Sequence, residues 1–94
     1  MRRRYLALAI DTQEVLSSKD LMDAIWDAVS KLYGEYGASR AGLALISYDV
    51  DKKLAIIRTV HSALEMTRVA LTSTTSIRNK PAAIHVVTVS GTIK

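Results

Sequence analysis

The sequence predicts an α+β protein with a ferredoxin-like βαββαβ order, in which a four-stranded antiparallel sheet carries two helices on one face. Three observations support this prediction. Side chains of alternating character at 4–10 and 83–90 indicate strands near both ends of the chain. Helical spacing of apolar residues follows a strand twice, at 21–36 and at 61–72. A short polar turn, Asp49–Asp51, joins two apolar segments as a hairpin.

The length and composition are those of one globular domain, 1–94, with 49% hydrophobic and 23% charged residues. No apolar segment approaches the ~20 residues that cross a bilayer, so we expect no membrane contact. Arginines precede the apolar segment Tyr5–Ile10, but that segment is too short for a signal peptide, and Asp11 follows at once. We therefore expect a cytoplasmic protein. The chain has no cysteine, which excludes a disulfide framework and a thiolate metal site.

The first strand and the first helix have clear signals. A period of two places Leu6, Leu8 and Ile10 on the core face. Ser17 or Ser18 is a suitable cap for the helix, which we expect to end at Gly34 and Gly37. Two apolar stripes run along this helix, one of Leu21, Ile25, Ala28 or Val29, Leu32 and Tyr36, and one of Met22, Trp26, Val29 and Tyr33. They indicate a well-buried helix, or one whose Trp26 and Tyr33 also meet a protein partner.

The second half of the chain reads as strand, strand, helix, strand. Strands are predicted at 42–48 and 53–60, a helix at 61–72, a polar loop at 73–81 and a last strand at 83–90. The sheet face away from the helices is expected to be poor in charge, and its assigned residues are Ala7, Ala9, Ala55, Ile57 and Val87.

This topology brings basic residues together. The first and third strands lie mid-sheet and the last strand pairs with the first, so the start of the first strand meets the end of the last. Arg2–Arg4 are therefore expected beside Gly91–Lys94, with Arg58 at the same edge. A second, less dense cluster of Lys52, Lys53, Arg78 and Lys80 falls at the opposite edge. The net charge of +4 favours an anionic partner.

No catalytic or metal-binding constellation is found. His61 and His85 have no partner at ligand spacing. Asp49 and Asp51 flank a turn and could hold Mg²⁺, but aspartate is common at turns for backbone reasons. We predict neither a catalytic residue nor a metal ligand.

Several function classes share this fold. RNA-recognition motifs have the same strand order and stack bases on aromatics of the first and third strands. Here the first strand offers only Tyr5 and the third has no aromatic, so we expect contacts with phosphates and shape instead. Acylphosphatase has a glycine-rich phosphate loop that is absent here, and residues 11–18 lack the glycines of an effector-binding module. A generic basic RNA-binding or protein-interaction module remains an alternative.

Two short motifs resemble a known family. Arg3-Arg4-Tyr5-Leu6 opens the first strand and Val89-Ser90-Gly91-Thr92-Ile93-Lys94 closes the last. These motifs, together with the strand–strand–helix pattern of Leu45–Leu71, resemble archaeal ribonuclease P protein component 2, the archaeal relative of the eukaryotic Pop-five subunit. The resemblance covers nearly the whole chain.

The resemblance implies a non-catalytic subunit of the ribonucleoprotein that removes the 5′ leader from precursor tRNA. Catalysis belongs to the ribonuclease P RNA and its bound Mg²⁺, the protein itself binds no cofactor, and precursor tRNA is met only indirectly. The implied protein partner is a barrel-shaped subunit of the Rpp-thirty family, and the pair can assemble as a dimer of heterodimers.

The expected site residues follow from charge, topology and this resemblance. The main RNA surface comprises Arg2, Arg3, Arg4 and Lys94, with the backbone at Gly91 and Thr92. Secondary RNA contacts are expected from Arg58, Arg78, Lys80, Lys52 and Lys53. Gly91 is expected to let a phosphate approach the main chain closely. Trp26 and Tyr33, or the open sheet face, are the candidates for protein contacts.

Overall fold

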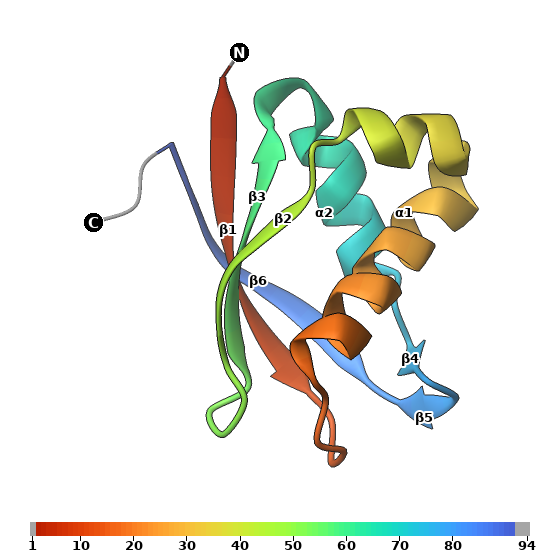
Figure 1. Ribbon diagram of the computed structural model, residues 1–94, viewed down its shortest axis with the longest axis vertical. Helices are drawn as coiled ribbons and strands as arrows, with labels where there is room; N and C mark the ends of the chain where they lie inside the picture. Colours follow the sequence, from red (N-terminus) through yellow and green to blue (C-terminus); the bar gives the residue numbers. More distant parts are fainter. Residues whose placement is uncertain (1, 92–94) are drawn as a thin grey trace.

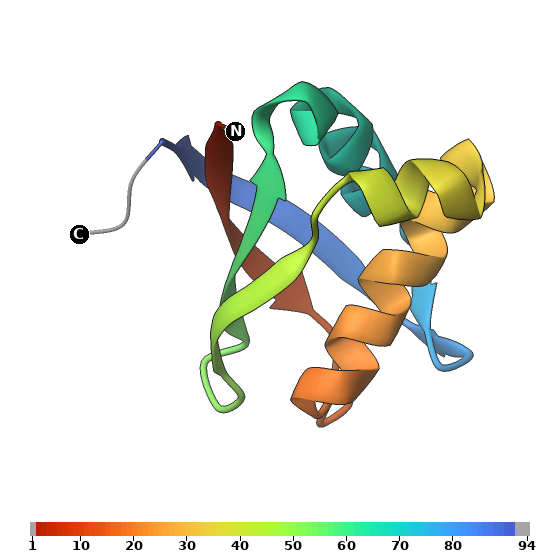
Figure 2. The same ribbon diagram turned by 45° about the horizontal axis from the view of Figure 1, so that its top comes forward.

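A computed structural model describes residues 2–91, and its architecture confirms the predicted ferredoxin-like fold. Four antiparallel strands form a sheet in the order β2-β3-β1-β6, and both long helices cover the same face of it (Figures 1 and 2). The elements are β1 Arg3–Asp11, α1 Ser18–Arg40, β2 Ala44–Asp49, β3 Leu54–Val60, the 3-10 turn η1 His61–Ala63, α2 Leu64–Thr72, β4 Ser76–Ile77, β5 Lys80–Pro81 and β6 Ala83–Ser90.

The core lies between the sheet and the helices. Leu6 and Leu8 of β1 face α1, whose Leu21 and Ile25 are fully buried against them. Ile57 of β3 joins the same cluster and is also fully buried. Removing such a side chain from water stabilises the fold by about 1.5–3 kcal/mol each. The alternation in β1 therefore decides which face of the sheet receives the helices.

α1 begins where the sequence predicts and ends later than predicted. Ser17 is the N-cap and forms a capping box with Asp20. Gly34, at φ +78°, interrupts the helix and bends it, but the chain resumes helical geometry and continues to Arg40. The prediction that the helix ends at Gly34 holds for its first segment, but Gly37 does not end the second segment, which runs to Arg40. The predicted core-facing stripe does not reach its last two residues, since Leu32 is 49% and Tyr36 is 73% exposed, whereas Ala38 beyond the bend is buried.

Two buried threonines fix the end of α1 to the sheet. The Thr59 hydroxyl donates to the Ala41 carbonyl at 2.6 Å and lies 3.4 Å from the Thr67 hydroxyl of α2. The Val60 backbone N–H donates to the same Ala41 carbonyl at 2.9 Å. Because Thr59 and Thr67 are fully buried, these bonds satisfy hydroxyls that would otherwise be costly to bury. The last turn of α1 is thereby held beside the end of β3.

The open face of the sheet differs from the prediction at β3. Ala55 and Ile57, assigned to that face, are buried under the helices at 2% and 0% exposure. The pairing of Leu6 with Ile57 and of Ala7 with Ile56 places Ile56 on the open face instead. All four residues of the segment Leu54-Ala55-Ile56-Ile57 are apolar, on both faces of the strand. The alternation of polar and apolar residues that would show which ones face inward is therefore absent.

Both outer strands of the sheet contain an irregularity. Along β6 the register with β1 shifts between Thr88 and Val86, which leaves Val87 as an extra residue. Along β2 the register with β3 shifts between Leu45 and Ser47, which leaves Ile46 as an extra residue. Each outer strand is therefore bent at its middle.

The predicted loop at 73–81 contains structure of its own. β4 and β5 form a hairpin whose turn residues, Arg78 and Asn79, both have positive φ values, 54° and 65°. Ile77 of this hairpin is only 3% exposed and belongs to the main core cluster. Ile77, the single aliphatic residue of the polar segment 73–81, therefore anchors this hairpin to the core. Within residues 2–91, no helix is both long and apolar enough to cross a bilayer.

Candidate nucleic-acid interface

Three strand ends meet at one end of the sheet, as the topology predicts. Tyr5 of β1 pairs with Arg58 of β3 on one side and with Ser90 of β6 on the other. The His61 backbone N–H donates to the Arg2 carbonyl at 2.8 Å, which ties the start of β1 to the end of β3. We call this region the arginine end, defined by Arg2, Arg3, Arg4 and Arg58. Thr92 and Lys94, also predicted here, lie outside the described residues.

The arginines of β1 are divided between the two faces of the sheet. Arg3 lies on the open face with Tyr5, because side chains alternate along a strand. Arg4 lies on the helix side, where its Nη1 donates to the Arg3 carbonyl at 3.1 Å. A Cβ atom at Gly91 would lie 3.2 Å from Arg4 Nη1. The space beside Gly91 is thus occupied by the Arg4 guanidinium rather than left open.

Arg58 carries an unsatisfied donor. It is half-buried on the open face, and its Nε is buried without a hydrogen-bond partner among the residues that the structure describes. A buried polar atom without a partner costs free energy, and more so when it belongs to a charged group.

The arginine end also lacks neutralising carboxylates. In the described part of the chain four ion pairs form, and none includes an arginine of this end. The cations used in these pairs are Lys19, Lys31, Arg68 and Arg78. The positive charge at the arginine end therefore acts outward, toward solvent or a polyanion.

Arg40 extends this cationic region and was missed in the sequence. It lies at the end of α1, next to Ala41, whose carbonyl bonds Val60. Its Nη1 donates to the Tyr36 hydroxyl at 2.7 Å, and its guanidinium carbon lies 5.4 Å from the centre of that ring. Tyr36 and Arg40 are four residues apart, a spacing that brings side chains together on a helix. This contact was not predicted because the helix was expected to end at Gly37.

The second basic group lies at the opposite end of the sheet, as predicted, but it is not a concentrated positive surface. Arg78 Nη1 is 2.8 Å from Asp20 Oδ1, and Lys53 donates to the Thr12 carbonyl. The loops and strand ends around this group also carry acids, namely Asp11, Glu14, Asp20, Asp23, Asp49 and Asp51. Mixed charge there makes Arg78 and its neighbours weaker candidates for RNA than the arginine end.

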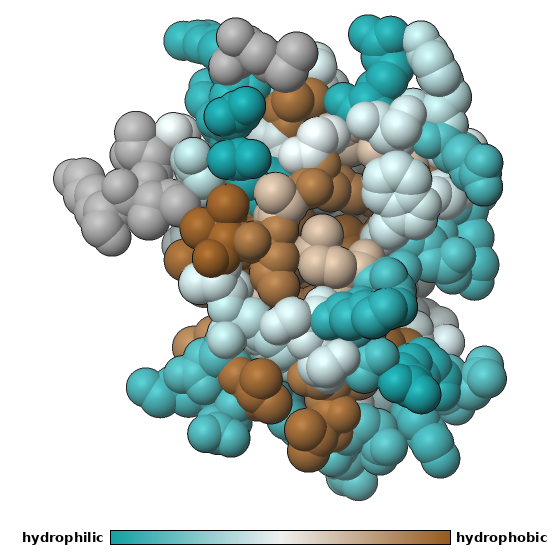
Figure 3. Space-filling model, in the orientation of Figure 1, coloured by the Kyte–Doolittle hydropathy of each residue, from teal (hydrophilic) through white to brown (hydrophobic). Residues whose placement is uncertain are grey.

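The flank of α1 exposes the predicted aromatic pair. Trp26 is 42% and Tyr33 is 41% exposed. They are seven residues, about two helical turns, apart, so they lie on the same side of α1. Figure 3 shows hydrophobic side chains gathered across the middle of the view, along β2 and between β2 and α1, whereas most of the side chains above and below are hydrophilic. This flank is apolar where the arginine end is charged.

The comparison with known proteins decides the family. Residues 4–94 match the sequence profile of the Rpp14/Pop5 family. The chain belongs to the Rpp14/Pop5 family. Its relatives include Ribonuclease P protein component 2 of Methanosarcina mazei, at 31% identity over 99% of this chain and 78% of the relative. The same component of Pyrococcus abyssi is 32% identical over 99% of this chain and 79% of the relative.

A solved structure shares the fold of this Rpp14/Pop5 protein. One chain of the cryo-EM structure of yeast Ribonuclease MRP matches it with a TM-score of 0.75. The match covers 96% of this chain and 74% of that chain, at 18% sequence identity. The resemblance noted in the sequence is therefore confirmed at the level of family and of fold.

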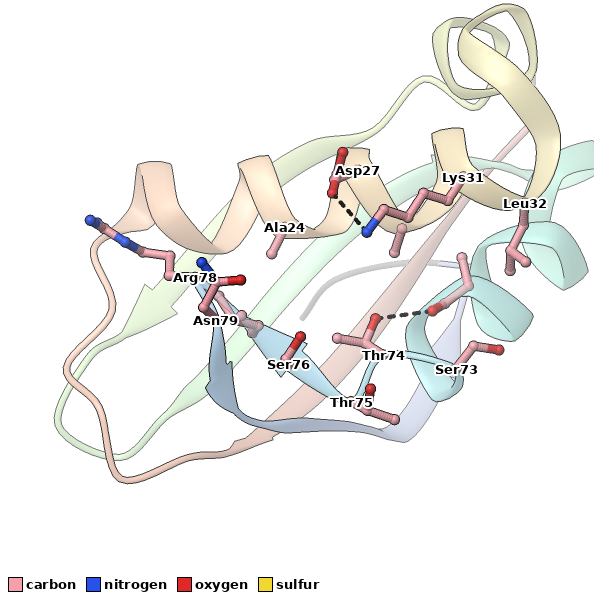
Figure 4. A pocket seen from close by; sticks show the side chains of 13 residues that line it. Ala24, Asp27, Lys31, Leu32, Ser73, Thr74, Thr75, Ser76, Arg78 and Asn79 are labelled. Carbon is pink, nitrogen blue, oxygen red and sulfur yellow. Dashed lines mark hydrogen bonds and ion pairs between the residues drawn. The ribbon is translucent and has the colours of Figure 1, made fainter.

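A cavity of about 400 Å³ lies away from the arginine end of this family member, between α1, the end of α2 and the β4–β5 hairpin (Figure 4). Small residues such as Ala28 and Ala70 line it. On its rim Asp27 and Lys31 form an ion pair at 3.5 Å, and the Thr74 hydroxyl donates to the Ala70 carbonyl at 3.1 Å. Asp27 and Lys31 neutralise one another, and Arg78 on the lining is paired with Asp20, so the cavity offers no concentrated charge to RNA.

The histidines of this Rpp14/Pop5 protein lie apart, His61 in η1 and His85 in β6, and both are exposed. In the part of the chain that the structure describes, no three His, Cys, Asp or Glu side chains form a group that could hold a metal ion. The geometry supplies positive charge and apolar surface, which are the means of binding an RNA and a protein.

The capping box of Ser17 and Asp20 is expected to make the stability of this protein depend on pH in the acid range. The Ser17 backbone N–H, 3.2 Å from Asp20 Oδ2, lowers the pKa of Asp20 below its ordinary 3.8, and Arg78 acts in the same direction. A lowered pKa stabilises the fold above pH 3.8, and that contribution is lost as pH falls through the folded-state value. We expect Asp20→Asn to lower the free energy of unfolding at pH 7, with the difference from wild type vanishing toward pH 2.

Urea titrations between about pH 2 and pH 7 measure this difference. Arg78→Ala is the matched comparison, because it removes the second partner of Asp20 and leaves the larger effect, the Ser17 bond, in place. It should therefore weaken the acid response less than Asp20→Asn does. A constant gap between Asp20→Asn and wild type at every pH would contradict the prediction.

Proposed function

We propose that this chain binds ribonuclease P RNA through the arginine end and supports removal of the 5′ leader from precursor tRNA, without a catalytic residue of its own. Its family and relatives make it a protein subunit of ribonuclease P. The observation that carries the proposal is the meeting of four arginines without carboxylate partners at one end of the sheet, while the opposite end has mixed charge.

The proposed mechanism is electrostatic. Arginine guanidinium groups bind phosphate oxygens, often through two hydrogen bonds at once, and release condensed counterions. Neutralising phosphates lets RNA helices approach one another and favours the form of the RNA that binds its Mg²⁺. The ions stay on the RNA, which performs the cleavage, and precursor tRNA is met only indirectly.

The residues contribute unequally in this proposal. Arg3 and Arg58 share the open face and Arg4 lies on the helix side, so one RNA segment would meet the end of the sheet from more than one direction. Arg78 is already paired with Asp20 and is assigned a weaker role. The full proposed RNA surface is Arg2, Arg3, Arg4, Arg58, Gly91, Thr92 and Lys94, with Arg78 and Lys80 as secondary contacts.

The protein partner is proposed to dock on the apolar flank of α1. Trp26 and Tyr33 are each about two-fifths exposed, and large aromatics on a surface favour protein contacts. The partner class is the barrel-shaped Rpp-thirty subunit, with two such pairs forming a dimer of heterodimers in the cytoplasm. An apolar flank for protein and a charged end for RNA would let both bind at once.

Reconstitution tests the proposed function. Ribonuclease P RNA is assayed on precursor tRNA over a Mg²⁺ series, with and without this chain and the Rpp-thirty partner. We expect the two proteins together to lower the Mg²⁺ concentration that gives half-maximal cleavage, and this chain without RNA to cleave nothing. Absence of stimulation at moderate Mg²⁺ would instead favour a generic basic RNA-binding or protein-interaction module.

A single fluorine label tests the partner surface. The chain has one tryptophan, so 5-fluorotryptophan gives one ¹⁹F resonance, from position 26. We expect the Rpp-thirty partner to shift and broaden this signal, because docking would bury Trp26, and ribonuclease P RNA alone to leave it unchanged. A shift caused by RNA alone, with none from the partner, would place this flank on the RNA side.

A further inference from the structure

We propose that Tyr5 and Arg58 form a binding site for one unpaired RNA nucleotide on the open face of the sheet. The base would stack on the Tyr5 ring, and a neighbouring phosphate would bind Arg58 and Arg3. This inference rests on the proposed RNA-binding function and adds a ligand class, single-stranded RNA, and a residue, Tyr5, that the charge pattern alone does not select.

The first step of the argument is the pairing of the two residues. Tyr5 in β1 and Arg58 in β3 are directly opposite in the central strand pair of the sheet. Directly opposed side chains in an antiparallel pair have Cβ atoms about 4.5–5.5 Å apart. Two side chains that start so close together on one face can contact the same nucleotide.

The second step is the orphaned nitrogen of Arg58. Its Nε is buried and has no partner within residues 2–91. Among those residues, the only cation placed over an aromatic ring is Arg40 over Tyr36, so the Arg58 guanidinium does not cover the Tyr5 ring. The half-buried Tyr5 ring is therefore not covered by Arg58, and a ligand would meet the Arg58 guanidinium through its terminal nitrogens, since the Nε is buried. A phosphate oxygen is the acceptor that best matches a guanidinium.

The third step is what surrounds the pair. Arg3 lies on the same face, two residues before Tyr5 in β1, and is paired with Val60 of β3. Farther along the same face come the apolar Ala7 and Ile56. An aromatic ring with cations at one end and aliphatic residues at the other fits a base and its backbone. One aromatic supports one stacked base rather than a continuous run.

The experiment compares single-stranded with double-stranded RNA. The probes are an RNA octamer of mixed sequence and an eight-base-pair RNA duplex, titrated against the whole chain over a series of salt concentrations. Stacking on one aromatic changes affinity for a single strand by roughly 5- to 150-fold. We expect Tyr5→Leu to lower octamer affinity within that range, to leave duplex affinity within about twofold and to leave both salt slopes unchanged. Tyr5→Phe should retain octamer affinity because it retains the ring.

Matched variants separate stacking from charge. Tyr33→Leu removes an exposed aromatic on α1, outside the open face, and should leave octamer affinity within about twofold of wild type. Arg58→Ala should lower the octamer salt slope by about 0.7, the value for one phosphate on a single strand. Equal losses on octamer and duplex from Tyr5→Leu, or no loss on either, would overturn the proposal.

A wild-type experiment keeps the test independent of folding. The octamer with 5-bromouridine at each position is irradiated in the complex, and the linked residue is identified by mass spectrometry. Crosslinking at Tyr5 supports the site, and crosslinks confined to other residues overturn it. If reconstituted ribonuclease P is stimulated while Tyr5 proves irrelevant, only this inference fails. If the wild-type chain binds neither probe and gives no stimulation, the proposed function fails with it.

Discussion

Replacing Arg2, Arg3 and Arg4 together with alanine is expected to reduce RNA affinity by up to several-hundred-fold at about 0.1 M salt. Each phosphate that an arginine no longer neutralises lowers the slope of log affinity against log salt by about 0.9 on duplex RNA, by analogy with B-DNA, and lowers affinity about eightfold at that concentration. Removing all three arginines therefore changes the slope by up to about three. Filter binding or fluorescence anisotropy over a salt series measures both quantities.

The opposite end of the sheet supplies the matched control for this experiment. Lys52, Lys53 and Lys80 carry the same total charge as the three arginines but lie among carboxylates. Their joint replacement with alanine should change the slope much less. If the two triple variants lose the same affinity and slope, net charge rather than the arginine end attracts the RNA, and the assignment of the interface is wrong.

Ile57→Ala is expected to cost about 2–5 kcal/mol of unfolding free energy, the largest effect on stability that we predict. Ile57 is fully buried in the main core cluster, so its truncation leaves a cavity as well as removing apolar packing. A domain of this size has a total stability of roughly 5–15 kcal/mol, so such a loss would lower Tm by roughly 10–30 °C. Thermal and urea denaturation followed by circular dichroism measure it.

The neighbouring residue makes this a test of the orientation of β3. Ile56→Ala removes the same atoms from the adjacent position, which faces the open side and is only half-buried. We expect it to cost about 1 kcal/mol, well below Ile57→Ala. A larger loss from Ile56→Ala would mean that the inward and outward faces of β3 are reversed.

Local patterns were sufficient to predict some elements in full. In β1 the alternation of Leu6 and Leu8 with small alanines has only one reading, and it is confirmed. The Ser17 cap was found because its side chain satisfies an orphan N–H of the first helical turn, a need that depends on nearby residues alone. The pairing of the first strand with the last followed from the element order, since only a few topologies are compatible with it.

Other features depended on contacts that sequence patterns do not contain. Gly34 does interrupt the helix, but the sequence did not reveal the second helical segment beyond it, whose Ala38 is buried by contacts with distant residues. The orientation of β3 could not be read from four consecutive apolar residues. The same holds for the candidate site, because the positive charge was evident in the sequence whereas the ion pair that neutralises Arg78 joins residues 58 positions apart.

The extra residues in the two outer strands have a consequence for self-association. An unpaired strand edge is a template onto which another chain can add, which is how many β proteins polymerise. The bends at Ile46 and Val87 interrupt the straight run of edge groups that such addition requires. Both edge strands are thereby less able to pair with another copy of the chain, which disfavours aggregation into fibres before the protein enters its complex.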